Sequence, residues 1–116
     1  MVKFMVFIVR NPAMSPEAFE RHFREIHGPL ALALPGLVGY CQNMVRRDEQ
    51  TSPGFGPCDA VAELWFKDRA AFDGVWDTPE GEAAVADNPL FMDVGRSHWT
   101  VIEEFRELGG ESAPTN

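Results

Sequence analysis

Two of the chain's three histidines, His22 and His27, lie five residues apart in the segment HFREIHGPL. Imidazole titrates near neutral pH, so these side chains could transfer protons or bind a metal ion. In a regular α-helix, five residues separate two side chains by about 140° around the axis, whereas metal-binding pairs commonly use a spacing of four. The spacing therefore argues against a shared metal ion. His27 precedes a Gly-Pro pair, so it could equally be a residue that caps the end of a helix.

Besides His27, three polar side chains allow both a structural and a functional interpretation. His22 borders an apolar helical stripe and is interpreted first as a histidine at the edge of the core. Tyr40, the chain's only tyrosine, is either an ordinary sheet residue or a phenol that donates a hydrogen bond to an enolate or carbonyl oxygen. Glu63 lies within an expected strand, where a carboxylate needs a functional role or an ion pair, for instance across a dimer interface. His98 is interpreted as structural.

Large apolar side chains supply the core and could supply the wall of a ligand site. Trp65 and Phe72 are expected to be mostly core, as are Trp76, Phe91 and Met92. Some of them could also line an apolar pocket between helices and sheet. Such a pocket suits a small apolar or aromatic ligand.

These residues are positioned by elements that the apolar periodicity and the capping signals predict. Strands are expected at residues 2–9, 37–46, 59–66 and 97–105. A first helix is expected from Ser15 to His27, where Gly-Pro ends it and a short irregular or helical connector follows. A second helical region is expected from 68 to 76, with a further piece from 78 to 88. A polar, Gly/Pro-rich loop, 47–58, is a candidate to cover the pocket.

The order strand, helix, strand, strand, helix, strand predicts an α+β, ferredoxin-like βαββαβ fold. This fold has a four-stranded antiparallel sheet with the helices on one face. One domain is expected over residues 1–106, followed by a flexible tail over 107–116. The first strand is apolar on both faces, so the face without helices needs a cover, and a homodimer through the sheet faces is predicted.

Composition and charge exclude several classes of function. The 116 residues carry a formal net charge of −8 without a basic stripe, which argues against binding to nucleic acid or to an anionic membrane surface. The apolar run near the start is too short for a signal or membrane segment, so a cytoplasmic location is expected, with Cys41 and Cys58 as reduced thiols. The sequence contains no haem or flavin fingerprint, and no cofactor is expected.

Several linked motifs resemble the EthD family of dimeric α/β-barrel proteins, which is related to enzymes of the muconolactone methylisomerase type. They are SPEAFERHFREIHGPLALALPGLVGYCQN, DAVAELWF and TPEGEAAVADNPLFMD, and the resemblance runs from residue 1 to about 105. It implies a ferredoxin-like homodimer. It also implies an active-site role for the histidine of the HxPL motif, which is His27, and it places Tyr40 at the position of the family's PGLxxY motif.

The resemblance and the residues together predict a small-molecule enzyme that uses cofactor-free acid–base chemistry. The reaction would be an isomerisation, dehydration or cyclisation of a lactone or an aromatic, polyketide-like molecule, with His27 moving the proton and Tyr40 polarising an oxygen. The candidates for substrate contact are His22, Glu63, Trp65 and Phe72. Two alternatives stay open, namely a cofactor-free oxygenase and a non-catalytic ligand-binding accessory protein.

Overall fold

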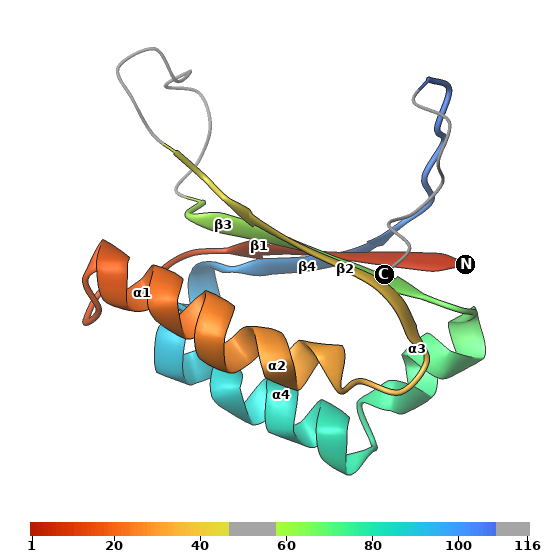
Figure 1. Cartoon of the computed structure of the whole chain (residues 1–116), viewed down its shortest axis with the longest axis horizontal. Coiled ribbons are helices and arrows are strands. Elements are labelled where there is room, and N and C mark those ends of the chain that lie inside the picture. The colour runs from red at the N-terminus through yellow and green to blue at the C-terminus, as the bar shows by residue number, and fades with distance from the viewer. Residues whose placement is uncertain (47–57, 109–116) are drawn as a thin grey trace.

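The structure, a computed structural model, describes residues 1–46 and 58–108 and contains one antiparallel sheet of four strands (Figure 1). The strands are β1 (Val2–Ile8), β2 (Leu37–Met44), β3 (Ala60–Phe66) and β4 (His98–Ile102). Their spatial order is β2-β3-β1-β4, and each neighbouring pair is antiparallel. This topology confirms the predicted ferredoxin-like fold. Apart from Cys58, the loop that could cover the pocket lies outside the described residues, as does the tail from residue 109 onward.

The helices form a layer on one face of the sheet (Figure 1). The first helical segment consists of α1 (Pro16–His22), the π-helical turn η1 (Phe23–His27) and α2 (Gly28–Leu32). The second consists of α3 (Arg69–Val75) and α4 (Pro79–Phe91), and a short 3-10 turn, η2 (Val94–Arg96), leads into β4. Helix α4 packs against both η1 and α2. No helix in the described part of the chain is long and apolar enough to span a bilayer.

The helix starts follow the capping signals in the sequence. The side-chain oxygens of Ser15, Asp68 and Thr78 each accept a hydrogen bond from the backbone N–H three residues later. These bonds satisfy donors that have no partner within the helix. Proline at the first position of α1 and of α4 adds a residue whose backbone angle already suits a helix. The three helix starts are therefore set by local chemistry.

The helical conformation continues past both prolines at which the sequence predicted a helix end. The predicted stops at Gly28-Pro29 and Asn88-Pro89 are therefore wrong, although the connector after Pro29 is helical, which was one of the two expected alternatives. In the first segment, the N–H of Gly28 bonds to the carbonyl of Phe23, five residues back, so that η1 is one residue wider than an α-turn. Pro29 lies in the first turn of α2, directly after the wide turn, and donates no backbone hydrogen bond there. In the second segment, Pro89 lies in the last turn of α4, which closes with a bond from Met92 N–H to Asn88 O.

The two faces of the sheet differ in their cover. Strand β1 directs Phe4, Val6 and Ile8 toward the helices, and all three are buried. Met5 and Phe7 alternate with them and are half-buried on the opposite face. The core therefore lies between the sheet and the helices. Its largest fully buried side chains are Phe19, Phe23, Phe66, Phe91, Ile8 and Val75.

Two glycines near the start of α4 should differ in how well they tolerate an added side chain. A Cβ on Gly81 would overlap the carbonyl oxygen of Val75, whereas a Cβ on Gly74 would meet nothing within 4 Å. We expect Gly81→Ala to lower the free energy of unfolding by about 1–3 kcal/mol through overpacking. Gly74→Ala should leave it unchanged or raise it by up to about 1 kcal/mol, because it restricts the unfolded chain. Urea denaturation measures both, and equal stabilities would contradict this account of the α4 start.

Candidate active site

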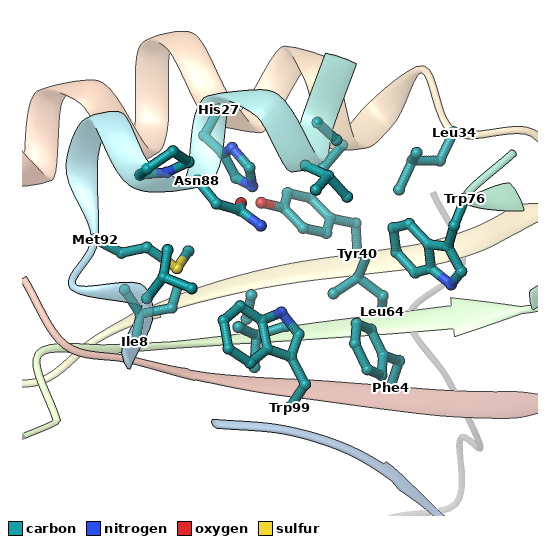
Figure 2. A pocket seen from close by; sticks show the side chains of 17 residues that line it. Phe4, Ile8, His27, Leu34, Tyr40, Leu64, Trp76, Asn88, Met92 and Trp99 are labelled. Carbon is teal, nitrogen blue, oxygen red and sulfur yellow. The ribbon is translucent and has the colours of Figure 1, made fainter. Parts of the chain in front are cut away.

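A cavity of about 680 Å³ lies between the sheet and the helices (Figure 2). Most of its lining is apolar and comes from β1, β3, α2 and α4, with Trp76 and Trp99 among the larger side chains. Three polar side chains, those of His27, Asn88 and Tyr40, lie close together on the helix side of the cavity, where the Tyr40 hydroxyl points toward Asn88 (Figure 2). An apolar cavity with a few polar groups at one place is the usual form of a small-molecule site.

The two histidines of the first helical segment converge on one carboxylate. Asp87 of α4 is only 7% exposed. Its Oδ1 lies 2.9 Å from His22 Nε2, and its Oδ2 lies 2.9 Å from His27 Nδ1. A carboxylate only accepts hydrogen bonds, so each imidazole donates one to it. Asp87 thereby keeps both oxygens paired although it is buried.

The expectation that the two rings lie on different sides of the helix is wrong. It assumed α-helical geometry, but residues 23–27 form a π-helical turn in which the hydrogen bond spans five residues. Residues five apart therefore return to nearly the same side of the axis. Among residues 1–46 and 58–108, no group of three or more His, Cys, Asp and Glu side chains is arranged to hold a metal ion. The convergence produces a hydrogen-bonded triad.

Phe91 packs against both imidazoles and is fully buried. The ring centroids of Phe91 and His22 are 5.1 Å apart with an interplanar angle of 16°. Those of Phe91 and His27 are 4.7 Å apart at 43°. Each histidine is thus held by a hydrogen bond at its edge and an aromatic ring at its face, which restricts rotation of both side chains.

His27 has the protonation and orientation of a general base. Burial lowers its pKa below the ordinary value of 6.5; the hydrogen bond and charge of Asp87 oppose this effect, and the charge of His22 adds to it. The ring is therefore neutral at pH 7. Since Nδ1 carries the proton donated to Asp87, Nε2 has a free lone pair, and the ring lines the cavity. Asp87 would stabilise the imidazolium that forms when Nε2 takes up a proton.

Tyr40 presents a neutral phenol to the same cavity. Burial raises the pKa of Tyr40 to about 12, so the hydroxyl keeps its proton at pH 7. Its oxygen accepts a hydrogen bond from Gln42 Nε2 at 2.9 Å. Tyr40 is thus able to donate its own proton to a ligand oxygen, which is the function that a phenol performs in oxyanion stabilisation.

The other predicted contact residues do not line the cavity. Glu63 and Trp65 lie on the opposite face of the sheet, where Lys3 pairs with Glu63 at 2.8 Å and lies over the Trp65 ring at 4.6 Å. The partner of Glu63 thus comes from its own chain. Phe72 packs in the core behind the cavity, 5.1 Å from Phe4 between ring centroids. His22 contacts Asp87 and Phe91 and does not border the cavity. Exposed His98 makes no described contact with the triad.

Three polar residues of the site were absent from the sequence-based candidates, namely Gln42, Asp87 and Asn88. Asp87 had a recognisable signal, since it shares the buried side of α4 with Ala84 and Phe91 at helical spacing. A carboxylate on a buried helical stripe requires a partner or a function. Gln42 and Asn88 had no comparable signal, because amides occur widely on sheets and near helix ends.

The sequence matches the EthD domain family over residues 11–95. An uncharacterized 11.0 kDa protein from the thcB-thcC intergenic region of Rhodococcus erythropolis is 28% identical over 92 residues. The matched residues cover 79% of this chain and 86% of that protein.

Solved structures share the fold at low sequence identity. An EthD-family protein from Bacillus halodurans has a TM-score of 0.73 at 21% identity, covering 90% of this chain and 100% of that one. SnoaB, a cofactor-independent oxygenase from Streptomyces nogalater, has a TM-score of 0.64 at 17% identity, covering 92% and 95%. A dimeric ferredoxin-like protein of unknown function from Jannaschia has a TM-score of 0.65 at 19% identity, covering 89% and 98%.

The contact between Asp87 and His27 predicts the direction of a pKa change. The hydrogen bond and charge of Asp87 raise the pKa of His27 against the effect of burial. Asp87→Asn removes the charge, so the pKa of His27 should fall further below 6.5. Titration of the imidazole proton resonances by NMR measures it. The control Asp73→Asn, at an exposed residue of α3, should leave the pKa of His27 unchanged. A rise in the His27 pKa in Asp87→Asn would contradict the described contact.

Proposed function

The chain belongs to the EthD family, and we propose that it is an enzyme that performs cofactor-free acid–base chemistry on a small, largely apolar molecule. The reaction would be an isomerisation, dehydration or cyclisation of a lactone or an aromatic, polyketide-like intermediate. The observation that carries the proposal is the position of His27 in the wall of an apolar cavity, with its Nδ1 bonded to the buried Asp87. A base of this kind, beside a phenolic donor, suits proton abstraction next to a carbonyl group.

In the proposed mechanism, Nε2 of His27 removes a proton from the carbon beside a substrate carbonyl. The electron pair of the broken C–H bond moves to the carbonyl oxygen, and Tyr40 donates a hydrogen bond to the resulting enolate. Asp87 stabilises the imidazolium, as a carboxylate does for a catalytic histidine. His27 then returns the proton to another carbon, which gives isomerisation, or to a leaving hydroxyl, which gives dehydration. Asn88, also in the cavity wall, offers an amide that orients the substrate.

A cofactor-free oxygenase is a second candidate, which the similarity to SnoaB favours. The same residues would serve its first step, because His27 could deprotonate an electron-rich phenol or enol. The resulting carbanion-like substrate would then react with molecular oxygen, which supplies the oxidant. Oxygen uptake during turnover separates this chemistry from isomerisation and dehydration, neither of which consumes oxygen.

We also propose that the chain forms a homodimer through the sheet face that the helices leave uncovered. On this face, Met5, Phe7 and Val61 are half-buried, and Phe7 and Val61 are cross-strand neighbours. A second copy would remove these apolar side chains from water. The dimeric state of the similar ferredoxin-like protein from Jannaschia supports a dimer of this chain.

The dimer proposal predicts the effect of one charge on that face. Phe7→Asp would place an unpaired carboxylate in the buried interface, so the variant should sediment as a monomer at micromolar concentration in analytical ultracentrifugation. Ala83→Asp introduces the same charge at an exposed position of α4 and should remain dimeric. A wild-type monomer at this concentration, or a dimeric Phe7→Asp variant, would contradict the proposed interface.

The proposed base can be tested without knowledge of the natural substrate. The enolisable bicyclic ketone 2-tetralone in D2O should exchange its α-protons faster with the wild-type protein than with buffer alone, as followed by NMR. His27→Gln should lower this rate by about 10²–10⁴-fold, and Tyr40→Phe by about 10²-fold. His22→Gln should affect stability more than rate, because His22 contacts Asp87 outside the cavity. His98→Gln serves as the control.

The pH dependence of the same exchange follows from the state of His27. Protonation of Nε2 removes the lone pair, so the rate should fall as the pH drops through the pKa of His27, which burial places below 6.5. Exchange that continues undiminished in His27→Gln would contradict the assignment of the base. A wild-type protein that binds the ketone without exchanging its protons would indicate a binding protein instead of an enzyme.

A further inference from the structure

Gln42 joins Tyr40 to the backbone of the π-helical turn. Its Nε2 lies 2.7 Å from the carbonyl oxygen of Phe23 and 2.9 Å from the hydroxyl of Tyr40. A carbonyl oxygen can only accept, so the atom facing Phe23 must be the amide nitrogen, and the orientation of the amide is fixed. The nitrogen carries two protons. One is donated to Phe23, and the other is donated to the oxygen of Tyr40.

This arrangement determines where the proton of Tyr40 points. Because the phenol oxygen accepts from Gln42, its own O–H bond must point away from Gln42. Within residues 1–46 and 58–108, the hydroxyl has no second hydrogen-bond partner. Tyr40 lines the cavity, and its hydroxyl is directed toward the group of polar side chains there (Figure 2). The free proton is therefore available to a ligand in the cavity.

We propose that Gln42 is a positioning residue that holds Tyr40 as a hydrogen-bond donor, so that this part of the cavity selects ligands with an acceptor oxygen on an apolar body. The fitting ligand class is an aryl or cyclic ketone, a lactone or an enolate. A ligand without an acceptor atom at this place would leave the Tyr40 proton unpaired. The inference deepens the proposed function and rests on its assignment of Tyr40.

Gly28 provides the space that Gln42 occupies. A Cβ at Gly28 would lie 3.1 Å from Gln42 Nε2, which is tighter than an ordinary contact. Gly28 also donates the hydrogen bond that closes the π-helical turn at Phe23. One carbonyl, that of Phe23, therefore closes the turn that aligns the histidines and also holds the amide that orients the phenol.

The test compares two ligands of nearly the same shape, 2-acetylnaphthalene and 2-isopropenylnaphthalene, in which a CH2 group replaces the ketone oxygen. Their binding can be followed through the fluorescence of the cavity tryptophans Trp76 and Trp99. The wild-type protein should bind the ketone with a dissociation constant about 3- to 10-fold lower than that of the alkene, which corresponds to the free energy of one hydrogen bond. Tyr40→Phe should abolish the preference, and Gln42→Met should reduce it to less than about 2-fold.

Controls separate orientation of the phenol from general damage to the site. Asn43→Met makes the same amide-to-thioether change on the opposite face of β2 and should keep the full preference. A loss of packing would weaken both ligands together and leave their ratio unchanged. If Gln42→Met does not fold, Gln42→Glu replaces it, because a carboxylate would accept the proton of Tyr40 and should likewise remove the preference.

The outcomes distinguish this inference from the proposed function. A full ketone preference in the Gln42 variant, together with its loss in Tyr40→Phe, overturns the positioning role and leaves Tyr40 in place. A preference that survives Tyr40→Phe overturns the role of Tyr40 as well. A wild-type protein that binds both ligands equally, or neither, overturns the proposed selectivity. Failure of the proton-exchange reaction would count against the enzyme alone, since the binding ratio does not depend on turnover.

Discussion

The hydrogen bond from Gly28 N–H to Phe23 O is the interaction on which the rest of the site depends. It widens one turn of the first helical segment by one residue and so turns His27 to the side of His22. With regular α-helical geometry, the two rings would lie about 140° apart and Asp87 could reach only one of them. The same carbonyl accepts the amide of Gln42, which contacts Tyr40. The wide turn thus organises both the proposed base and the proposed donor. π-Helical turns are rare, and they are frequently found at functional sites.

The buried carboxylate of Asp87 is the main electrostatic feature that follows from this turn. A buried carboxylate is costly unless its oxygens are paired, and here each oxygen accepts a hydrogen bond from an imidazole. Burial lowers the pKa of His27 while Asp87 opposes the effect, so the ring stays neutral near pH 7 and can form an imidazolium beside a negative charge. The surrounding cavity is mostly apolar, and a low effective dielectric strengthens such interactions. Proton transfer and its stabilisation therefore depend on the same packed contacts.

The fold could be predicted from the sequence because its signals are local. Strand alternation and the caps at Ser15, Asp68 and Thr78 act over a few residues, and the structure follows them. The site could be predicted only in part. The sequence proposes His27 and Tyr40, and both line the cavity. It predicts a helix stop at Gly28-Pro29, because a π-helical turn has no comparable local signal. Asp87 and Gln42 meet their partners through packing between elements distant in the sequence, and that packing also decides which face of the sheet carries Glu63.

The protonation state of His27 is the central property of the proposed site, and 15N NMR of the imidazole nitrogens measures it. Comparison with His22→Gln, His27→Gln and His98→Gln assigns the resonances of the three histidines. At pH 7, we expect His27 to be neutral, with the proton on Nδ1 and none on Nε2. The Nε2 resonance should shift when a ketone occupies the cavity. A His27 imidazolium at this pH, or a neutral ring with its proton on Nε2, would contradict the proposed role of His27, because the ring would then offer no lone pair to a substrate in the cavity.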